Sequence, residues 1–288
     1  MVTTTLRARL GGVWALLHPG PSLLTVAAYV LCAIVAAAGR PNPMRLGVTT
    51  LGLVCMQFAI SALNDYCDRE TDRRNAKKRK PLVLGLVSPA AALGITAVLS
   101  LAMFALFAPY GWGAVGLAGT FLALGFAYDL GIKSTPISGV MHGLAFPTLP
   151  LLAWDVFAHL RGELFWVLPI GMALGIGLHL ADALPDAEAD AAAGAHGLTQ
   201  ALGRAALPVC WGAFAVAAVI VAGLAATHPR PTRLPALIVL EALALALVAT
   251  ALITFGRHTT EAARWRQNFL LLVGAALATV VAWFTVIA

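Results

Sequence analysis

Eight of the thirteen carboxylates in this 288-residue chain lie in two short clusters that are far apart in the sequence. The first cluster comprises Asn64, Asp65, Asp68, Glu70 and Asp72, and the second comprises Asp182, Asp186, Glu188 and Asp190. The second cluster has no lysine or arginine among its carboxylates, so another cation must balance its charge. Oxygen ligands of this kind suit Mg²⁺, which commonly joins one or two carboxylates to substrate phosphates. The two clusters therefore predict a site for Mg²⁺ and a phosphate-bearing substrate.

A basic run at residues 73–80 directly follows the first cluster. Two interpretations apply to it. The run can fix the orientation of a membrane protein and attract anionic lipid, or some of its members can hold a diphosphate by charge-assisted hydrogen bonds. The members that we expect at the substrate are Arg73, nearest the acids, and Arg79 and Lys80, which precede Pro81.

Three further polar residues are candidates for substrate binding. Tyr128 and Lys133 follow one apolar stretch, where they are either an interfacial anchor pair or part of the site. Lys133 is the only basic residue in its short loop, and it is a candidate for contact with the diphosphate. His179 precedes Asp182 by three residues and faces the same side of a helix. It can support the ligands, act as a general base, or be a polar core residue.

The elements that carry these residues are apolar helices. The chain is 60% hydrophobic and 11% charged, with a mean hydropathy of +0.86, whereas soluble domains carry about 25% charged residues. We expect an all-α polytopic membrane protein that forms a single domain over residues 1–288. Nine segments have roughly the 20 residues that a membrane-crossing helix needs. They are 21–38, 46–64, 89–108, 111–128, 137–154, 164–181, 202–226, 234–255 and 268–287.

Lysines and arginines predict the orientation of the helices. With the N-terminus in the cytoplasm and the C-terminus outside, 14 basic residues lie on the cytoplasmic side and 5 on the outer side. This orientation places both acidic clusters at the cytoplasmic face of the membrane, which we expect to be a bacterial plasma membrane. The sequence pI of about 9.5 follows from this asymmetry, so it does not indicate a nucleic-acid partner.

Helical geometry brings the carboxylates of each cluster together. The three aspartates of the first cluster fall within a narrow arc at 100° per residue. The three aspartates of the second cluster do the same at spacings of four, although Pro185 should break or kink the helix just after Asp182. Each cluster can therefore aim three carboxylates at one point.

The motifs resemble those of a known family. The pattern Asn64-Asp65-x-x-Asp68-x-x-x-Asp72, followed by Lys80-Pro81, is similar to the first signature of the UbiA superfamily of membrane prenyltransferases. The stretch 179–190 resembles the second signature, and the stretch 128–133 resembles the tyrosine and lysine loop between them. Lys80 stands where many members have arginine, and the tyrosine-to-lysine spacing is one residue longer than in some members.

The resemblance implies nine helices around a central cavity that opens to the cytoplasm and to lipid. It implies two Mg²⁺ ions held by Asn64, Asp65, Asp68, Asp72, Asp182, Asp186 and Asp190. The ions grip a prenyl diphosphate, which ionises with the help of Asp68, Asp72, Asp186, Asp190 and Lys133. A lipophilic or aromatic acceptor then captures the allylic cation.

Other functions are compatible with parts of this pattern. The same metal-diphosphate site would serve a terpene cyclase of the same superfamily, or a transferase that moves a phosphoribosyl group to a polyprenyl phosphate. A transporter or cation channel is a third possibility, because acids within membrane segments mark ion paths. The acids of this chain gather at one face of the membrane, which argues against a path across it. Glu241 and His142 receive no role from the sequence.

Overall fold

The computed structural model describes residues 5–74, 80–192, 194–227, 232–257 and 260–287. Every regular element in these ranges is a helix, which confirms the all-α prediction. Eight helices of the described residues are long and apolar enough to cross a membrane. One of the nine predicted spans, 111–128, corresponds to the 18-residue helix α5 (Trp112–Asp129). The mean hydropathy of this helix is too low for it to count with the other eight. Several glycines and the terminal Tyr128 and Asp129 account for the difference.

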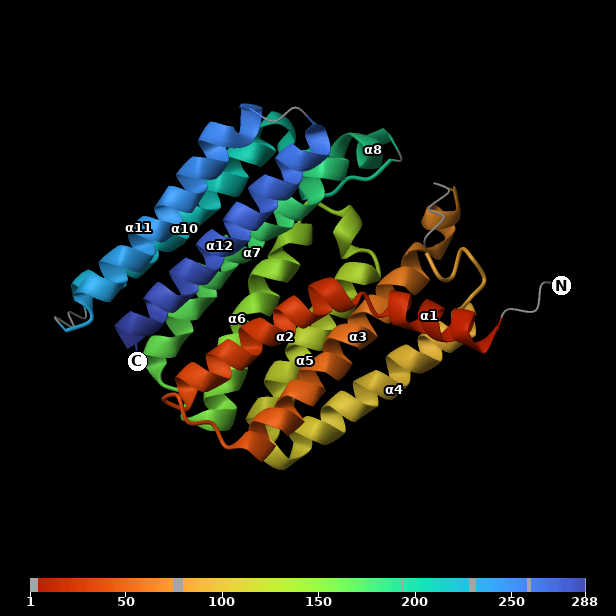
Figure 1. Cartoon of the computed structure of the whole chain (residues 1–288), viewed down its shortest axis with the longest axis horizontal. Helices are drawn as coiled ribbons and strands as arrows, with labels where there is room; N and C mark the ends of the chain where they lie inside the picture. Colours follow the sequence, from red (N-terminus) through yellow and green to blue (C-terminus); the bar gives the residue numbers. More distant parts are fainter. Residues whose placement is uncertain (1–4, 75–79, 193, 228–231, 258–259, 288) are drawn as a thin grey trace. The chain divides into compact units, whose positions relative to one another are not determined.

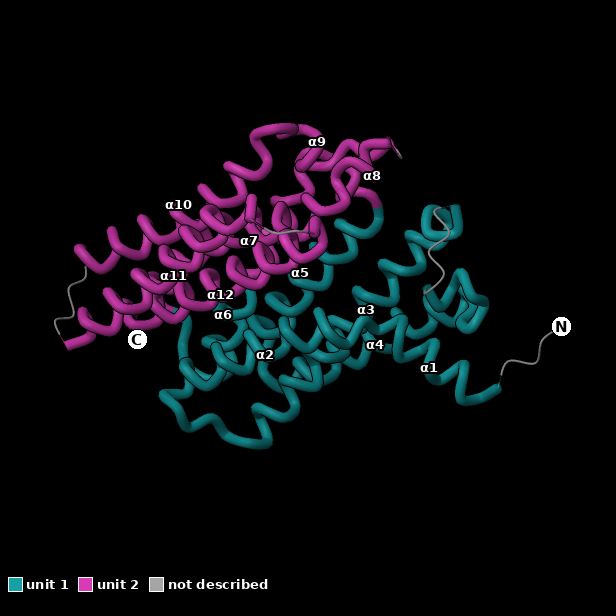
Figure 2. The backbone as a smooth tube through the Cα atoms, turned by 45° about the horizontal axis from the view of Figure 1, so that its top comes forward, with its two compact units in different colours: residues 1–130, 148–160 teal, residues 131–147, 161–288 magenta. Residues whose placement is uncertain are grey.

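The chain divides into two compact units, which Figure 2 colours separately. Unit 1 comprises residues 1–130 and 148–160, and unit 2 comprises residues 131–147 and 161–288. Helix α6 (Ser138–Phe157) contributes its first half to unit 2 and its second half to unit 1. The prediction of one domain over the whole chain stays a prediction.

The first half of the chain supplies the other helices of unit 1 (Figure 1). They are α1 (Leu6–Leu16), α2 (Pro19–Ala36), α3 (Pro43–Arg74), α4 (Pro89–Phe107), η1 (Ala108–Tyr110) and α5 (Trp112–Asp129). Helix α3 is the centre of the unit, because α1, α2, α4 and α5 all pack against it. Two glycines permit close packing in this unit. A Cβ at Gly52 would lie 2.7 Å from the Phe107 ring, and one at Gly125 would lie 2.6 Å from Ile60.

Unit 2 contains the remaining helices, and its long helices α7, α10, α11 and α12 run alongside one another in Figure 1. The short turn η2 (Ile132–Ser134) precedes the shared helix α6. The elements after α6 are η3 (Gly162–Trp166), α7 (Val167–Ala183), η4 (Leu184–Asp186), α8 (Ala187–Ala192), α9 (Leu198–Leu202), η5 (Gly203–Ala205), α10 (Ala206–Thr227), α11 (Leu234–Thr254), η6 (Phe255–Arg257) and α12 (Glu261–Ile287). Helix α7 packs against α10 and α12, and α11 packs against α12. Trp283 and Phe214 are buried in this core.

Helix starts follow local signals in the sequence. Pro19 and Pro89 open α2 and α4, where a missing backbone N–H costs nothing. The Ser88 hydroxyl accepts a hydrogen bond from the Ala91 backbone N–H and so caps α4. Two helices are longer than the spans predicted from hydropathy, since α3 continues to Arg74 and α12 begins at Glu261. Hydropathy marks the apolar part of a helix, and polar turns at its ends remain helical.

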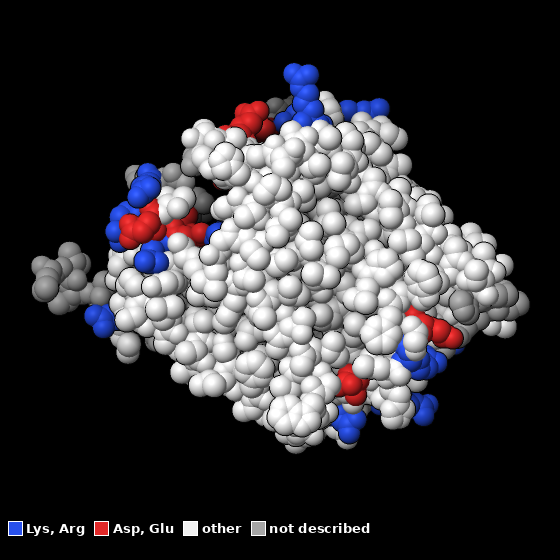
Figure 3. All heavy atoms as spheres, turned by 180° about the vertical axis from the view of Figure 1, so that it is seen from behind, with Lys and Arg blue, Asp and Glu red and all other residues white. Residues whose placement is uncertain are grey.

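The surface is mostly uncharged, as lipid contact requires. On the face that Figure 3 shows, lysine, arginine, aspartate and glutamate side chains gather in small groups and leave a broad area without charge. Large apolar side chains such as Leu101, Val219 and Val239 are exposed. All four cysteines are free thiols, of which Cys32, Cys55 and Cys210 are buried and Cys67 is half-buried.

Candidate active site

The first acidic cluster lies on the last turns of α3, in unit 1. The helix continues without a break to Arg74, so Asp65, Asp68 and Asp72 lie on one side of it, as predicted. Asp65 and Asp72 are buried, whereas Asp68 is half-buried. Buried carboxylates need partners, because an unpaired charge away from water is costly.

Lys80 and His18 share one oxygen of Asp65. Lys80 Nζ lies 2.5 Å from Asp65 Oδ1, and His18 Nε2 donates to the same atom at 2.8 Å. Lys80 Nζ also lies 3.9 Å from Asp72 Oδ2. The second oxygen of Asp65, Oδ2, is buried and accepts no hydrogen bond from the described residues. The contacts tie the junction of α1 and α2, the end of α3 and the segment after it to one carboxylate.

His18 adopts a strained backbone to make this contact. Its φ of 44° and ψ of 58° are left-handed, a conformation that residues with a Cβ seldom adopt. It also precedes Pro19, and residues before proline normally take an extended backbone. Strain of this kind costs on the order of 1–3 kcal/mol and is typical of functional sites.

Asn64 is oriented by a second buried carboxylate. Its side-chain nitrogen Nδ2 donates to Asp129 Oδ1 at 2.7 Å, and Asp129 is the buried last residue of α5. Because the amide nitrogen donates to Asp129, the carbonyl oxygen of the Asn64 side chain points away from Asp129. An amide oxygen is an acceptor and can bind a cation.

The basic residues around this cluster have different surroundings. Arg73 is exposed and forms an ion pair with Glu70, with 3.3 Å between Nη1 and Oε2. Arg69 packs over the Tyr66 ring and donates to the Tyr66 carbonyl oxygen at 2.6 Å. Arg79, which the sequence predicts at the substrate, lies outside the described residues. Lys80 is thus the basic residue with the closest described contacts to the acids.

The second acidic cluster lies at the end of α7, in unit 2, where the helix is interrupted as Pro185 predicts. Asp182 is in the last turn of α7, Asp186 ends the 3-10 turn η4, and Asp190 is in the short helix α8. All three side chains are exposed. A regular helix therefore does not carry this cluster, because the proline ring cannot accept the α-helical geometry of the preceding turn.

A buried hydrogen-bond chain lies one turn before Asp182. Ser138 Oγ and His179 Nε2 are 2.9 Å apart, and the backbone N–H of Leu198 donates to Ser138 Oγ at 3.2 Å. The Ser138 hydroxyl thus joins the backbone of Leu198 to the His179 ring by two hydrogen bonds. The His142 ring stacks on the His179 ring with 4.8 Å between centroids.

Tyr128 and Lys133 belong to different units. Tyr128 is half-buried near the end of α5 in unit 1, and Lys133 is half-buried within η2 in unit 2. Gly131, at a φ of 148°, allows the chain to turn into η2. The carbonyl oxygen of Lys133 approaches Gly197 so closely that a Cβ there would lie 3.1 Å from it.

The donor set fits Mg²⁺ in composition. The described residues contain no group of three or more histidines, cysteines, aspartates or glutamates already gathered as a metal site. The unpartnered buried Oδ2 of Asp65 and the oriented carbonyl oxygen of Asn64 nevertheless offer oxygen atoms beside Asp68 and Asp72. Oxygen atoms of carboxylate and amide are the ligands that Mg²⁺ prefers in proteins.

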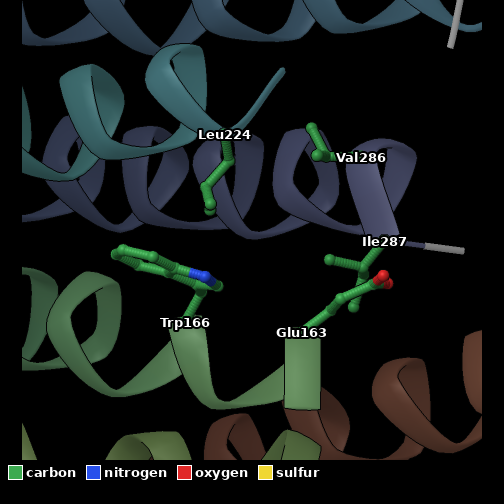
Figure 4. Close-up of a pocket in the computed structure, with 5 residues that line it drawn as sticks. All are labelled: Glu163, Trp166, Leu224, Val286 and Ile287. Atoms are coloured by element: carbon green, nitrogen blue, oxygen red, sulfur yellow. The ribbon is translucent and has the colours of Figure 1, made fainter. Parts of the chain in front are cut away.

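A small pocket lies at the opposite end of α7 from Asp182. Glu163 and Trp166 of η3, Leu224 of α10, and Val286 and Ile287 of α12 line it (Figure 4). Its lining is mostly apolar and contains none of the predicted site residues. It does not belong to the acidic site.

Four residues of this geometry were not predicted as site residues. They are His18, Asp129, Ser138 and Gln200. His18 and Asp129 sit at ends of apolar segments, where a polar residue is common, so composition alone gives no signal. Their partners are 47 and 65 residues away along the chain.

Comparison with known proteins agrees with the motifs. The model of the UbiA prenyltransferase family matches residues 23–274, a range that contains both acidic clusters. A 4-hydroxybenzoate octaprenyltransferase from Albidiferax ferrireducens is 36% identical over 147 residues, which are 46% of this chain and 49% of that protein. One from Pseudoalteromonas atlantica is 30% identical over 168 residues, 53% of this chain and 59% of that protein. The chain thus spans about half the length of the curated relatives it matches.

Solved structures are similar along almost the whole chain. A UbiA homolog from Archaeoglobus fulgidus bound to DMAPP and Mg²⁺ has a TM-score of 0.74 at 15% identity, covering 94% of this chain and 98% of that one. The apo structure of a UbiA homolog from Aeropyrum pernix K1 has a TM-score of 0.69 at 19% identity, covering 90% and 97%. At such identities the likeness establishes the fold alone.

Proposed function

Because the chain belongs to the UbiA prenyltransferase family, we propose that it transfers a prenyl group from a prenyl diphosphate to a lipophilic or aromatic acceptor within the membrane. The observation that carries the proposal is the family match over residues 23–274, which includes both acidic clusters and the loop of Lys133. The orientation of Asn64 by Asp129 and the buried Oδ2 atom of Asp65, which accepts no hydrogen bond from the described residues, support it, since both leave an oxygen atom for a cation.

The oxygen ligands fall into two sets, one in each unit. Asn64, Asp65, Asp68 and Asp72 form the first set, and Asp182, Asp186 and Asp190 form the second. Mg²⁺ bound to these residues supplies positive charge that stabilises the departing diphosphate. Asp65 also holds Lys80, because its Oδ1 atom accepts from Lys80 and His18, whereas its Oδ2 atom is left for the metal.

Cationic side chains complete the diphosphate site. The carboxylates offset much of the charge of the metal, so the diphosphate needs further positive groups. The candidates for this role are Arg73, Arg79, Lys80 and Lys133, and Tyr128 and His179 are further candidates for substrate binding. Lys80 is a point charge and not a bidentate group, so it follows the phosphate oxygens without fixing their plane.

The reaction itself is an alkyl transfer. The C–O bond between the allylic carbon and the diphosphate breaks, and the diphosphate leaves with the electron pair. An electron-rich carbon or oxygen of the acceptor attacks the allylic carbon and then loses a proton. Apolar side chains around the reacting carbon would exclude water, which would otherwise capture the cation.

The names of the relatives favour an aromatic acid as the acceptor. The curated proteins that the chain resembles are 4-hydroxybenzoate octaprenyltransferases, although the match spans about half their length. We therefore propose a hydroxybenzoate-like acceptor as the first to test. The basic asymmetry supports a site at the cytoplasmic face of a bacterial plasma membrane.

The test is a product analysis with the purified full-length chain in lipid nanodiscs. Prenyl diphosphates of several chain lengths are incubated with Mg²⁺ and 4-hydroxybenzoate or other phenols, and products are identified by mass spectrometry. A prenylated phenol supports the proposal. A cyclised hydrocarbon without acceptor, a phosphoribosylated polyprenyl phosphate in a parallel reaction, or no release of diphosphate with any donor overturns it.

Variants connect the activity to the residues. Asp68→Asn and Asp186→Asn should abolish product formation while the protein stays folded. Asp129→Leu should raise the Mg²⁺ concentration for half-maximal activity about tenfold, because it frees the Asn64 side chain to rotate. Asp155→Leu is the matched control, since this carboxylate packs against Gly113 near the start of α5. Equal Mg²⁺ requirements for the Asp129 and Asp155 variants would contradict the orienting role.

A further inference from the structure

A short segment of unit 2, residues 197–200, contacts both parts of the site that unit 2 supplies. The first contact is with the loop of Lys133. The Lys133 carbonyl oxygen lies against Gly197, where a Cβ would be 3.1 Å from it. The φ of Gly197 is −67°, so the backbone would accept any residue. Glycine is needed at this position for the close approach and not for its conformational freedom.

The second contact anchors the end of the same loop. Ser138, the first residue of α6, is 1% exposed and lies five residues after Lys133. Its hydroxyl accepts a hydrogen bond from the Leu198 backbone N–H and is hydrogen-bonded to His179, which is 6% exposed. The start of the 133–138 loop therefore lies against Gly197, and its end is hydrogen-bonded to the backbone of Leu198 and to His179 of α7.

The third contact reaches the second acidic cluster. Gln200 Nε2 donates to the carbonyl oxygen of Ala187 at 3.1 Å. Ala187 lies between Asp186 and Glu188, directly after the turn where Pro185 interrupts the helix. An interrupted helix lacks the regular hydrogen bonds that would fix its side chains. The Gln200 side chain supplies one such bond from outside.

We propose that residues 197–200 are a positioning element that fixes the Lys133 loop and the Asp186 turn relative to each other, so that both bind one metal-diphosphate group. The inference rests on the proposed function, because that function supplies the ligand. Groups held in place before binding lose less conformational freedom when the ligand arrives, and affinity rises accordingly. Ser138 and Gln200 are thus positioning residues, since they act through Lys133 and Asp186.

The first experiment measures ligand binding, with no turnover. Mn²⁺, which takes the same oxygen ligands as Mg²⁺, is titrated by electron paramagnetic resonance with the thiolo analogue of geranyl diphosphate, whose C–S bond resists ionisation. Gln200→Met keeps the size of the side chain and removes its N–H donor. It should weaken Mn²⁺ binding about tenfold or more, as outer-shell changes at metal sites do.

The matched control is Gln267→Met. Gln267 is also half-buried in unit 2, and its Nε2 donates to Thr254 Oγ1 at 3.2 Å between α12 and α11. The same chemical change there should leave Mn²⁺ binding unaltered. Equal losses in the two variants, or no loss in Gln200→Met, would overturn the positioning role.

The second experiment is a double-mutant cycle on binding of the analogue. Ser138→Ala should weaken binding in the wild-type background and have no further effect in Lys133→Ala, because it acts through Lys133. Additive losses would mean that Ser138 only stabilises the fold, and would overturn its part in the proposal. If the wild-type protein binds neither Mn²⁺ nor the analogue, the proposed function itself fails, which is a different outcome from unchanged variants.

Discussion

Asp65 illustrates, at the scale of the residue, how a buried charge selects its neighbours. It is 2% exposed, and both Lys80 and His18 direct a donor to its Oδ1 atom. Lys80 balances the charge, and His18 adds a hydrogen bond at the expense of a strained backbone. The sequence motif predicts Asp65 as a metal ligand, but it contains no information on His18, whose contact depends on the packing of α1 and α2 on α3.

His18 leads to a prediction about stability. His18→Ala removes the hydrogen bond to Asp65 and keeps a Cβ in the left-handed conformation, so it should lower the free energy of unfolding by about 1–3 kcal/mol. His18→Gly loses the same bond but relieves the backbone strain, and should be more stable than the alanine variant by about 1 kcal/mol. Thermal unfolding in detergent measures both. An alanine variant as stable as the wild type would show that the contact with Asp65 contributes nothing.

At the scale of the element, the sequence predicts what local chemistry decides. Hydropathy locates all the long helices, and Pro185 correctly places the interruption after Asp182. Hydropathy underestimates the length of α3, because the last turns of this helix are charged, carry the first cluster and lie beyond the apolar segment. The hydrogen bonds that Asp129 and Gln200 make to the two clusters were not predictable, because their partners lie in other segments of the chain.

Close packing of α6 and α7 within unit 2 depends on small residues. A Cβ at Gly175 would lie 2.7 Å from Gly143 Cα and from its backbone nitrogen. Gly175→Ala must therefore push the two helices apart, and overpacking of this kind costs about 1–3 kcal/mol. We expect a lower melting temperature than that of the wild-type protein, measured by intrinsic fluorescence.

The control for this variant is Gly212→Ala on α10, where a Cβ would meet no atom within 4 Å. Alanine is the better helix former, so this variant should be as stable as the wild type or more stable. Similar losses in both variants would attribute the effect to helix propensity and not to contact between α6 and α7.

At the scale of the whole molecule, the chain is an integral membrane protein of the UbiA family, and its orientation is open to direct measurement. Glu163 and Glu188 lie near the two ends of one candidate span, Gly162–Ala192. The excess of basic residues beside the acidic clusters predicts that Glu188→Cys reacts from the cytoplasmic side and Glu163→Cys from the outer side.

This labelling requires a Cys67→Ser background, because the other native cysteines are buried. Membrane-impermeant maleimide is applied to right-side-out and inverted vesicles, and the labelled protein is quantified in each. Reversed labelling would place the second acidic cluster outside the cell, away from cytoplasmic prenyl diphosphates, and would contradict the proposed orientation.

The same cysteine gives the unmodified protein a reporter of its own. Cys67 lies between Asp65 and Asp68 and is the one thiol of the four that is not buried. Cys67 lies about 130° around α3 from the side that carries the aspartates, so a bound ligand would not cover it directly. If Mg²⁺ and a prenyl diphosphate make the end of α3 more rigid, the alkylation rate of this half-buried thiol should fall when both are present. Mass spectrometry of the peptide that contains Cys67 then measures ligand binding in native membranes, without isotopes, purification or turnover.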